Sequence, residues 1–285
     1  YYVGLFGRAG TGSAISNIGL EGGSVIGNYQ VGGLVGDSSA TITSCYSTGT
    51  VLASGADIGG LVGANSGTIT LSYVTGAVTG DYDVGGFVGY STGIITSCYA
   101  TGAVLTDGDG GGFIGSGTAT ITSCYATGAV TGNSEIGGFI GYGSTFGTIT
   151  SCYAAGLVTA NSNFGGFIGH GTGTFTSCYW DTQTSGQSTS NGGTGLTFVQ
   201  TVFESSFAGF DFTTNPDWAI VEGDSRPYLP WQGTVVYEDI TYAAFDYTGT
   251  TKNGKYATPY NTLATAISNV TTNGSLVLKS GTSTE

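Results

Sequence analysis

Short apolar runs broken by glycine recur along the first 180 residues of the chain. One run has the pattern apolar-Gly-Gly-apolar-apolar-Gly, as in VGGLVG at residues 31–36, and a second follows as TITSCYSTGTV at residues 41–51. These runs are rich in Val, Ile, Thr, Tyr and Phe, which favour strands, whereas a helix would not tolerate so much Gly, Thr and Ser. The pattern therefore predicts many short β-strands.

The runs repeat in register. The double-glycine pattern begins at Val31, Ile58, Val84, Ile136 and Phe164, with a variant at Gly110 and a shorter form at Val3, so that successive starts are 26 to 28 residues apart. A unit this small cannot bury its apolar face alone and must stack on its neighbours. We therefore expect an all-β fold, a parallel β-solenoid of about seven coils, which at the spacing of stacked strands is roughly 34 Å long.

Like residues recur at equivalent positions of the coils, and one such ladder consists of cysteines. Ile18 of the first coil aligns with Cys45, and because this position accepts a large aliphatic group, the cysteines are expected to point inward as small core residues. Adjacent coils would also place their Cα atoms within disulfide range, so pairs such as Cys98 with Cys124 stay open as an alternative. The core ladder comprises Cys45, Cys98, Cys124, Cys152 and Cys178, with Ser72 in the second coil.

The repeat ends near residue 180, and we expect three segments: a solenoid over 1–180, a segment closing the array over 181–233, and a C-terminal segment over 234–285. In the last segment Leu263, Ala266, Ile267 and Val270 fit one helical face, and residues 274–281 read as a strand ending in a turn. The chain starts at Tyr1 within a repeat, so it is expected to be a piece of a longer protein.

The composition excludes some classes of partner. The chain has 5 Lys and Arg against 18 Asp and Glu, a net charge of −13, which disfavours nucleic-acid binding because phosphates require cations. No run of 18 apolar residues is present, so no membrane span is expected.

The core GGLVG at residues 32–36, with its SCYSTG partner at residues 44–49, resembles the GLUG motif of bacterial and archaeal surface proteins. The resemblance covers roughly residues 3–180, and the segment after residue 234 is similar to the start of a right-handed parallel β-helix. The resemblance implies a large, secreted, often adhesin-like prokaryotic protein at the cell surface.

An acidic ladder stands just before the double-glycine pattern. Stacked carboxylates repel one another, and Ca²⁺, which takes oxygen ligands, would relieve the repulsion; the alternative is a solvated turn, because Asp and Asn form turns readily. The candidate calcium ligands are Asp57, Asp81, Asp83, Asp107, Asp109 and Glu135. No other cofactor is expected.

A tyrosine ladder follows the cysteines. Since neighbouring strand residues point to opposite faces, these rings are expected to face outward, where they would stack on surface glycans or on a neighbouring rod; alternatively, they support one another along the solenoid. The ladder comprises Tyr46, Tyr73, Tyr99, Tyr125, Tyr153 and Tyr179.

Catalysis finds little support in the sequence. His170 is the only histidine, and its equivalents are Asp37, Ala64, Tyr90, Ser116 and Tyr142, which indicates a variable loop position. We therefore expect no enzyme, and a polysaccharide-active β-helix is the least favoured interpretation.

Two non-enzymatic functions remain. The first is an extracellular structural subunit that self-associates end to end into a cell-surface filament, because the first coil at Tyr1 presents an uncapped solenoid edge. The second is a stalk segment of a large secreted adhesin that binds glycans or surfaces.

Overall fold

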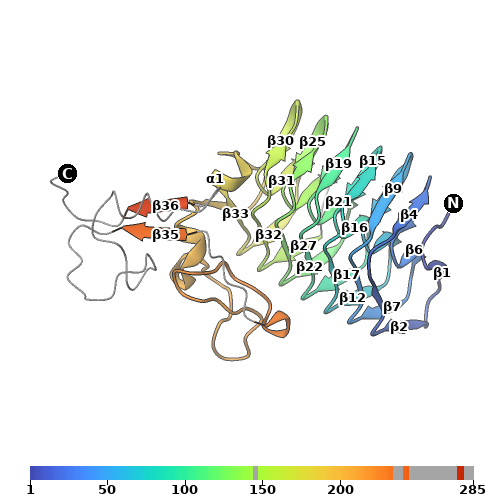
Figure 1. The fold of residues 1–285 in the computed structure, drawn as a ribbon, viewed down its shortest axis with the longest axis horizontal. Helices are drawn as coiled ribbons and strands as arrows, with labels where there is room; N and C mark the ends of the chain where they lie inside the picture. The colour runs from blue at the N-terminus through green and yellow to red at the C-terminus, as the bar shows by residue number, and fades with distance from the viewer. Residues whose placement is uncertain (144–146, 234–239, 244–274, 279–285) are drawn as a thin grey trace. The chain divides into compact units, whose positions relative to one another are not determined.

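The structure is a computed structural model that describes residues 1–143 and 147–233 and the strands 240–243 and 275–278. The chain divides into two compact units, Tyr1–Phe198 and Val199–Glu285. The first unit is a parallel β-solenoid of about seven coils, as the sequence predicts. Figure 1 shows its coils side by side along the array, from β1 to β33.

Each coil contributes strands to five parallel sheets, here called A to E in their order along a coil. Sheet A comprises β5 (Val31–Gly32), β10 (Ala56–Gly59), β15 (Tyr82–Gly85), β20 (Gly110–Gly111), β25 (Ser134–Gly137) and β30 (Ser162–Gly165). Sheet B comprises β1 (Phe6–Ala9), β6 (Val35–Ser38), β11 (Val62–Asn65), β16 (Val88–Ser91), β21 (Ile114–Gly117), β26 (Ile140–Gly143) and β31 (Ile168–Gly171). Sheet C comprises β2 (Ala14–Ser16), β7 (Thr41–Thr43), β12 (Thr68–Thr70), β17 (Ile94–Thr96), β22 (Thr120–Thr122), β27 (Thr148–Thr150) and β32 (Thr174–Thr176).

The remaining two sheets complete the coil. Sheet D comprises β3 (Gly19–Leu20), β8 (Tyr46–Ser47), β13 (Tyr73–Val74), β18 (Tyr99–Ala100), β23 (Tyr125–Ala126), β28 (Tyr153–Ala154), β33 (Tyr179–Asp181) and β34 (Thr194–Leu196). Sheet E comprises β4 (Ser24–Gly27), β9 (Thr50–Ala53), β14 (Val78–Gly80), β19 (Val104–Thr106), β24 (Val130–Thr131) and β29 (Val158–Thr159). Equivalent residues pair directly, for example Ile69 with Ile95, so the repeat register of the sequence is the register of the sheets.

Coil length varies by one residue at the corner between sheets E and A and by two residues at the corner between sheets B and C. Ile114 pairs with Ile140 in sheet B and Ile121 with Ile149 in sheet C, so the later coil holds two more residues between these sheets. The pairing in sheet C nevertheless continues in register. Among the described residues, the pairs next to this corner are absent on either side, and the remaining pairs of sheets B and C keep their register.

Two apolar cores run along the solenoid. The larger core contains the Leu and Phe ladder after the double glycine, the Ile ladder of sheet C and the cysteines. Within it, Phe87, Phe113, Phe139 and Phe167 stack with ring centroids 4.8 to 4.9 Å apart. The smaller core consists of Val and Ile side chains of sheets A and E. Burial of these ladders is the main favourable contribution to folding.

The glycines of the repeat mark the place where the backbones of sheets A and B meet. A Cβ atom on Gly89 of sheet B would lie 2.3 Å from the Ile58 nitrogen and 2.4 Å from the Asp57 carbonyl carbon, both in the preceding coil of sheet A. A Cβ on Gly59 would meet the Val62 oxygen and the Gly89 nitrogen. Side chains are therefore excluded here, because backbone packs on backbone.

The cysteine ladder points inward, and all five thiols are free and buried. Each described thiol donates to a backbone carbonyl two residues earlier, as Cys124 Sγ does to Thr122 at 3.2 Å. The Cys98 amide donates to Cys124 Sγ at 3.3 Å, and Ser72 fills the same role for the Cys45 amide at 3.0 Å. Burial raises the pKa of the Cys124 thiol, so it stays protonated and able to donate. The ladder is thus both a core and a hydrogen-bonded chain.

Replacing Cys124 with serine is expected to change the free energy of unfolding by less than about 1 kcal/mol, because Ser72 already performs this role natively. Replacement with valine is expected to cost about 1–3 kcal/mol, because the buried Cys98 amide loses its acceptor. Urea unfolding followed by circular dichroism measures both. Equal stability of the two variants would contradict the hydrogen-bonding role.

Residues 181–198 close the C-terminal edge of the solenoid. The short helix α1 (Thr182–Ser185) begins at Asp181, whose carboxylate accepts from the Gln183 and Thr184 amides. Beyond it, Ser190 Oγ accepts from the Phe167 and Ile168 amides at 3.2 and 2.8 Å, and β34 adds a last strand to sheet D. Amides of the last coil that another coil would pair with are thereby hydrogen-bonded.

The second unit has little regular structure in its described part. It contains the 3₁₀ turns Gln200–Val202, Glu204–Ser206 and Pro230–Gln232, and a buried Trp218 stacked on Phe210 with centroids 4.7 Å apart. The strands β35 (Ile240–Ala243) and β36 (Ser275–Leu278) pair in parallel, which confirms the strand predicted within 274–281. The helix predicted from Leu263 to Val270 lies outside the described residues.

Candidate functional site

Two ladders of polar residues face each other across a groove on the first unit. The acid ladder precedes sheet A or lies at its edge and comprises Gln30, Asp57, Asp83, Asp109, Glu135 and Asn163. The facing ladder lies in sheet B and comprises Asp37, Ala64, Tyr90, Ser116, Tyr142 and His170, which pair coil to coil. The position that the sequence indicates as a variable loop is therefore part of a strand.

Backbone conformation explains why Asp and Asn are common in the acid ladder. Most of its members adopt left-handed φ angles, among them Asp57 at 61°, Asp83 at 49° and Asn163 at 49°. Short polar residues tolerate this conformation better than most others. The turn alternative from the sequence thus accounts for much of the residue choice.

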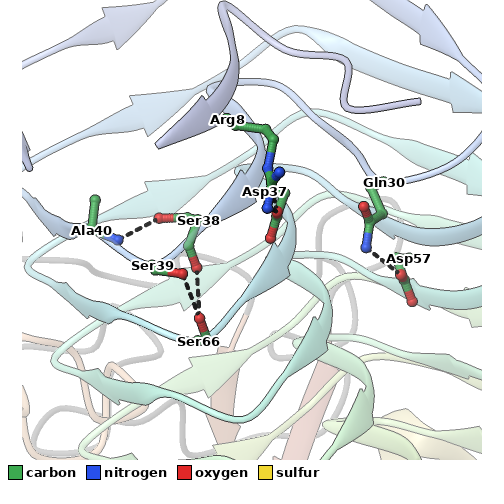
Figure 2. A network of polar contacts seen from close by, with 8 residues as sticks. All are labelled: Arg8, Gln30, Asp37, Ser38, Ser39, Ala40, Asp57 and Ser66. Atoms are coloured by element: carbon green, nitrogen blue, oxygen red, sulfur yellow. Dashed lines mark hydrogen bonds and ion pairs between the residues drawn. The ribbon is translucent and has the colours of Figure 1, made fainter. Parts of the chain in front are cut away.

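Polar contacts occur at both ends of the groove, within each ladder at the first coils and between the two ladders at the other end. At the first coils, Arg8 Nη2 forms an ion pair with Asp37 Oδ2 at 2.8 Å, and Gln30 Nε2 donates to Asp57 Oδ2 at 3.1 Å (Figure 2). At the other end, His170 Nδ1 lies 3.5 Å from Glu135 Oε1 and its ring stacks on Tyr142. Between these ends lies a cavity of about 570 Å³, lined by Asp83, Asp109, Tyr90, Ser116 and Tyr142, among others.

The carboxyl groups of the groove lie close enough together that their negative charges repel one another. Burial, a hydrogen bond with Glu135 and repulsion from Glu135 and Asp83 raise the pKa of Asp109 to about 7. Burial, with repulsion from Asp83 and Asp37, also raises the pKa of Asp57, although the Gln30 hydrogen bond opposes it. Arg8 is the only Lys or Arg in the sequence of the first unit, so these acids have few cations to pair with.

The raised pKa of Asp109 predicts a pH dependence of stability. When folding raises the pKa of a carboxyl from 3.8 to about 7, the fold loses stability progressively as pH rises from 3.8 to about 7, because the unfolded chain gives up this proton first. Between pH 5.5 and 8 we expect the melting temperature to fall, with about 1 kcal/mol from Asp109 after allowance for solvent screening. Thermal unfolding at several pH values measures the slope, and Asp109→Asn should flatten it. An unchanged slope in the variant would contradict this origin.

The residues predicted to bind calcium do not converge. Asp57, Asp83, Asp109 and Glu135 lie along the acid ladder, one coil apart, whereas Asp81 and Asp107 lie in the turns between sheets E and A. In residues 1–143 and 147–233, no three His, Cys, Asp or Glu side chains are grouped so that they would hold a metal ion. The donor set does not fit Ca²⁺, which needs six to eight oxygens around one point.

The tyrosine ladder of sheet D stacks on itself. From Tyr46 to Tyr153, successive rings lie 4.8 to 5.1 Å apart and nearly parallel. Tyr46, Tyr73 and Tyr99 are half-buried, whereas Tyr125, Tyr153 and Tyr179 are buried. The rings therefore cover one another's faces, which matches the alternative of mutual support and leaves little ring surface for sugars.

Sequence reasoning did not identify Tyr90, Ser116 and Tyr142 as one site. Their common signal is a constant offset after the double glycine, which places them in one column of sheet B. That column becomes a groove wall only because the close backbone packing of sheets A and B brings the acid ladder opposite it.

No helix in the described part of the chain has the length and hydrophobicity needed to cross a lipid bilayer. A search of curated protein sequences finds no significant match.

The comparisons with known proteins agree with the fold. Residues 27–52 and 80–105 match the family model described as the GLUG motif. A solved structure from Bacteroides ovatus, described as a "putative immunoglobulin A1 protease", is similar over 76% of this chain and 69% of that chain, with 19% identity and a TM-score of 0.51. At this identity the likeness concerns the fold alone. The chain therefore carries two copies of the GLUG motif within a parallel β-solenoid fold.

Proposed function

We propose that this chain is a non-enzymatic structural protein of the extracellular surface, in which the solenoid serves as a rigid spacer. The observation that carries the proposal is the unbroken register of all five sheets from the first coil to the last. Cysteine and tyrosine, which would otherwise supply reactivity or binding, are used in ladders that hold neighbouring coils together. Such an array resists bending because every coil is hydrogen-bonded to the next.

Between the two structural roles, the C-terminal edge of the solenoid favours a stalk segment over a filament of directly stacked coils. At the C-terminal edge, Ser190 and β34 cover the last coil, so a second copy would have to displace them before continuing its sheets. Direct head-to-tail stacking at this edge would therefore require the closing segment to move away.

Electron microscopy and sedimentation velocity on the purified full chain test the structural role. We expect discrete particles whose sedimentation coefficient does not change between micromolar and near-millimolar concentration. Filaments with a repeat of one chain length would establish direct stacking and replace the stalk assignment. Immunogold labelling of intact source cells tests the location, and label confined to the cell interior would overturn it.

An assay of product release from a panel of polysaccharides tests the non-enzymatic part of the proposal. The expected result is no release of reducing ends or unsaturated products above a boiled control. Release that disappears in Asp109→Asn would show that the groove is catalytic and would overturn the proposal.

A further inference from the structure

The small side chain of Ser116 leaves space between two larger side chains of the facing ladder, and this space is part of the cavity. Ser116 pairs with Tyr90 on one side and Tyr142 on the other, so a small residue stands between two large aromatic ones. Two coils of the solenoid separate the two tyrosines by roughly 10 Å. Asp83 and Asp109 line the opposite wall of the same cavity.

The Ser116 hydroxyl is a polar group without a use in the fold. Ser116 is 5% exposed and lines the cavity, and its hydroxyl has no hydrogen-bond partner among residues 1–143 and 147–233. The Ser116 oxygen is open to the cavity, so it is available to a ligand that binds there. A serine hydroxyl can donate its one proton to a carboxylate and still accept through its lone pairs, which leaves an acceptor position for a ligand that carries N–H or O–H groups.

The chemistry of the walls indicates the charge of that ligand. Carboxylates on one wall attract a cation, and the ring faces of Tyr90 and Tyr142 attract it as well. Tyr142 stacks on His170 along the solenoid, so its other face is directed toward the space at Ser116. Two coils separate the Cα atoms of the two tyrosines by roughly 10 Å, so a cation midway between rings at that spacing lies about 5 Å from each, within the range of a cation–π contact.

We propose that this cavity, bounded by Tyr90, Ser116, Tyr142, Asp83 and Asp109, binds a primary ammonium group carried on a saturated carbon, such as that of a lysine side chain or an amino sugar. The ammonium group supplies three N–H donors, for the Ser116 hydroxyl and the carboxylates, and its charge neutralises the acid ladder. A volume of about 570 Å³ leaves room for the carbon skeleton that carries the group. The site is independent of the structural role proposed above.

A titration followed by ligand-observed NMR tests the proposal on the full chain at pH 8. The probes are n-butylamine, Nα-acetyl-lysine methylamide and glucosamine, with N-acetylglucosamine as the uncharged counterpart. We expect millimolar dissociation constants for the cationic probes and at least about tenfold weaker binding of N-acetylglucosamine. The lysine and glucosamine arms distinguish the two sources of the ammonium group. Equal binding of glucosamine and N-acetylglucosamine would overturn the proposal.

Variants locate the binding in the cavity. Asp109→Asn should weaken n-butylamine binding at least about fivefold, whereas Asp81→Asn, which removes the same charge outside the cavity, should change it less than about twofold. Equal effects of these two variants would show that binding follows net charge and would overturn the site.

A second variant separates hydrogen bonding from general attraction and leaves the fold intact. Ser116→Ala removes a hydroxyl that has no partner among the described residues, so circular dichroism and the melting temperature should not change. It should weaken n-butylamine several-fold and leave tetramethylammonium, which has no N–H donors, unaffected. Equal changes for both amines would contradict the assigned role of Ser116.

The pH dependence of n-butylamine binding gives an independent readout. The groups that face the Asp109 carboxyl are Asp83 and Glu135 on its own ladder and Tyr90, Ser116 and Tyr142 across the cavity, with His170 beside Glu135. Affinity should rise several-fold from pH 5.5 to pH 8 as the carboxyls lose protons. A rise of the same size in Asp109→Asn would contradict the role of this residue.

Discussion

Replacing Gly89 with alanine is expected to unfold the solenoid or to lower its melting temperature by about 10 °C or more. The new Cβ atom would lie 2.3 to 2.8 Å from three backbone atoms, the Ile58 nitrogen, the Asp57 carbonyl carbon and the Gly63 oxygen. Backbone atoms in paired strands cannot rotate away as a side chain can, so sheets A and B must separate. A cost above about 4 kcal/mol is a large fraction of the stability of a typical domain. Differential scanning calorimetry of the full chain measures the change.

Gly10→Ala is the matched control for this substitution. Gly10 is exposed, and a Cβ atom built there meets no atom within 4 Å. Its effect on the free energy of unfolding should stay within about 0.5 kcal/mol. If both alanine variants melt together with the parent chain, the close packing of the two sheets cannot be the reason for the glycine at position 89.

Replacing Phe113 with alanine is expected to reduce the free energy of unfolding by about 4 kcal/mol. The Phe113 ring is fully buried and lies 4.8 Å from both the Phe87 and the Phe139 rings. Alanine would leave a cavity in the middle of this stack and remove both ring contacts. Urea unfolding followed by circular dichroism measures the loss.

Two further variants show whether the position or the residue type matters. Phe113→Leu should cost only about 1 to 1.5 kcal/mol, because Leu34 and Leu61 occupy the same position in earlier coils. Phe164→Ala removes a phenylalanine that is 41% exposed in sheet A and should cost about 1 kcal/mol or less. A similar loss from Phe113 and Phe164 would contradict the role of the buried stack.

The repeat allowed most of the solenoid to be predicted, because a periodic sequence can satisfy its buried ladders only by stacking in register. The alignment of Ile18 with Cys45 was sufficient to orient the cysteines inward. It did not indicate that the thiols bond to amides of the neighbouring coil, since Ile18 in the first coil lacks that capacity. The serine at position 72 was the signal for these hydrogen bonds. Serine is smaller than cysteine, but it can form the same hydrogen bonds.

The closing segment and the groove were harder to predict, for different reasons. Residues 181–198 do not repeat, so no periodicity indicates that Ser190 would reach the amides of Phe167 and Ile168. The groove arises from the fold between two sheets within each coil, and a ladder seen in the sequence does not show which other ladder lies opposite. Calcium binding stays a prediction; a linear stack spaces carboxylates along an axis, and in the described part of the chain no three of them are grouped around one point.

The corner between sheets B and C is a suitable place to insert foreign peptides into the solenoid. Because this corner accepts extra residues while sheet C stays in register, short foreign peptides inserted there in chosen coils should be presented at a pitch of about 5 Å per coil. Antigens or enzymes fused at that corner would then form a row, and the number of coils between two fusion sites would set the distance between the fused groups.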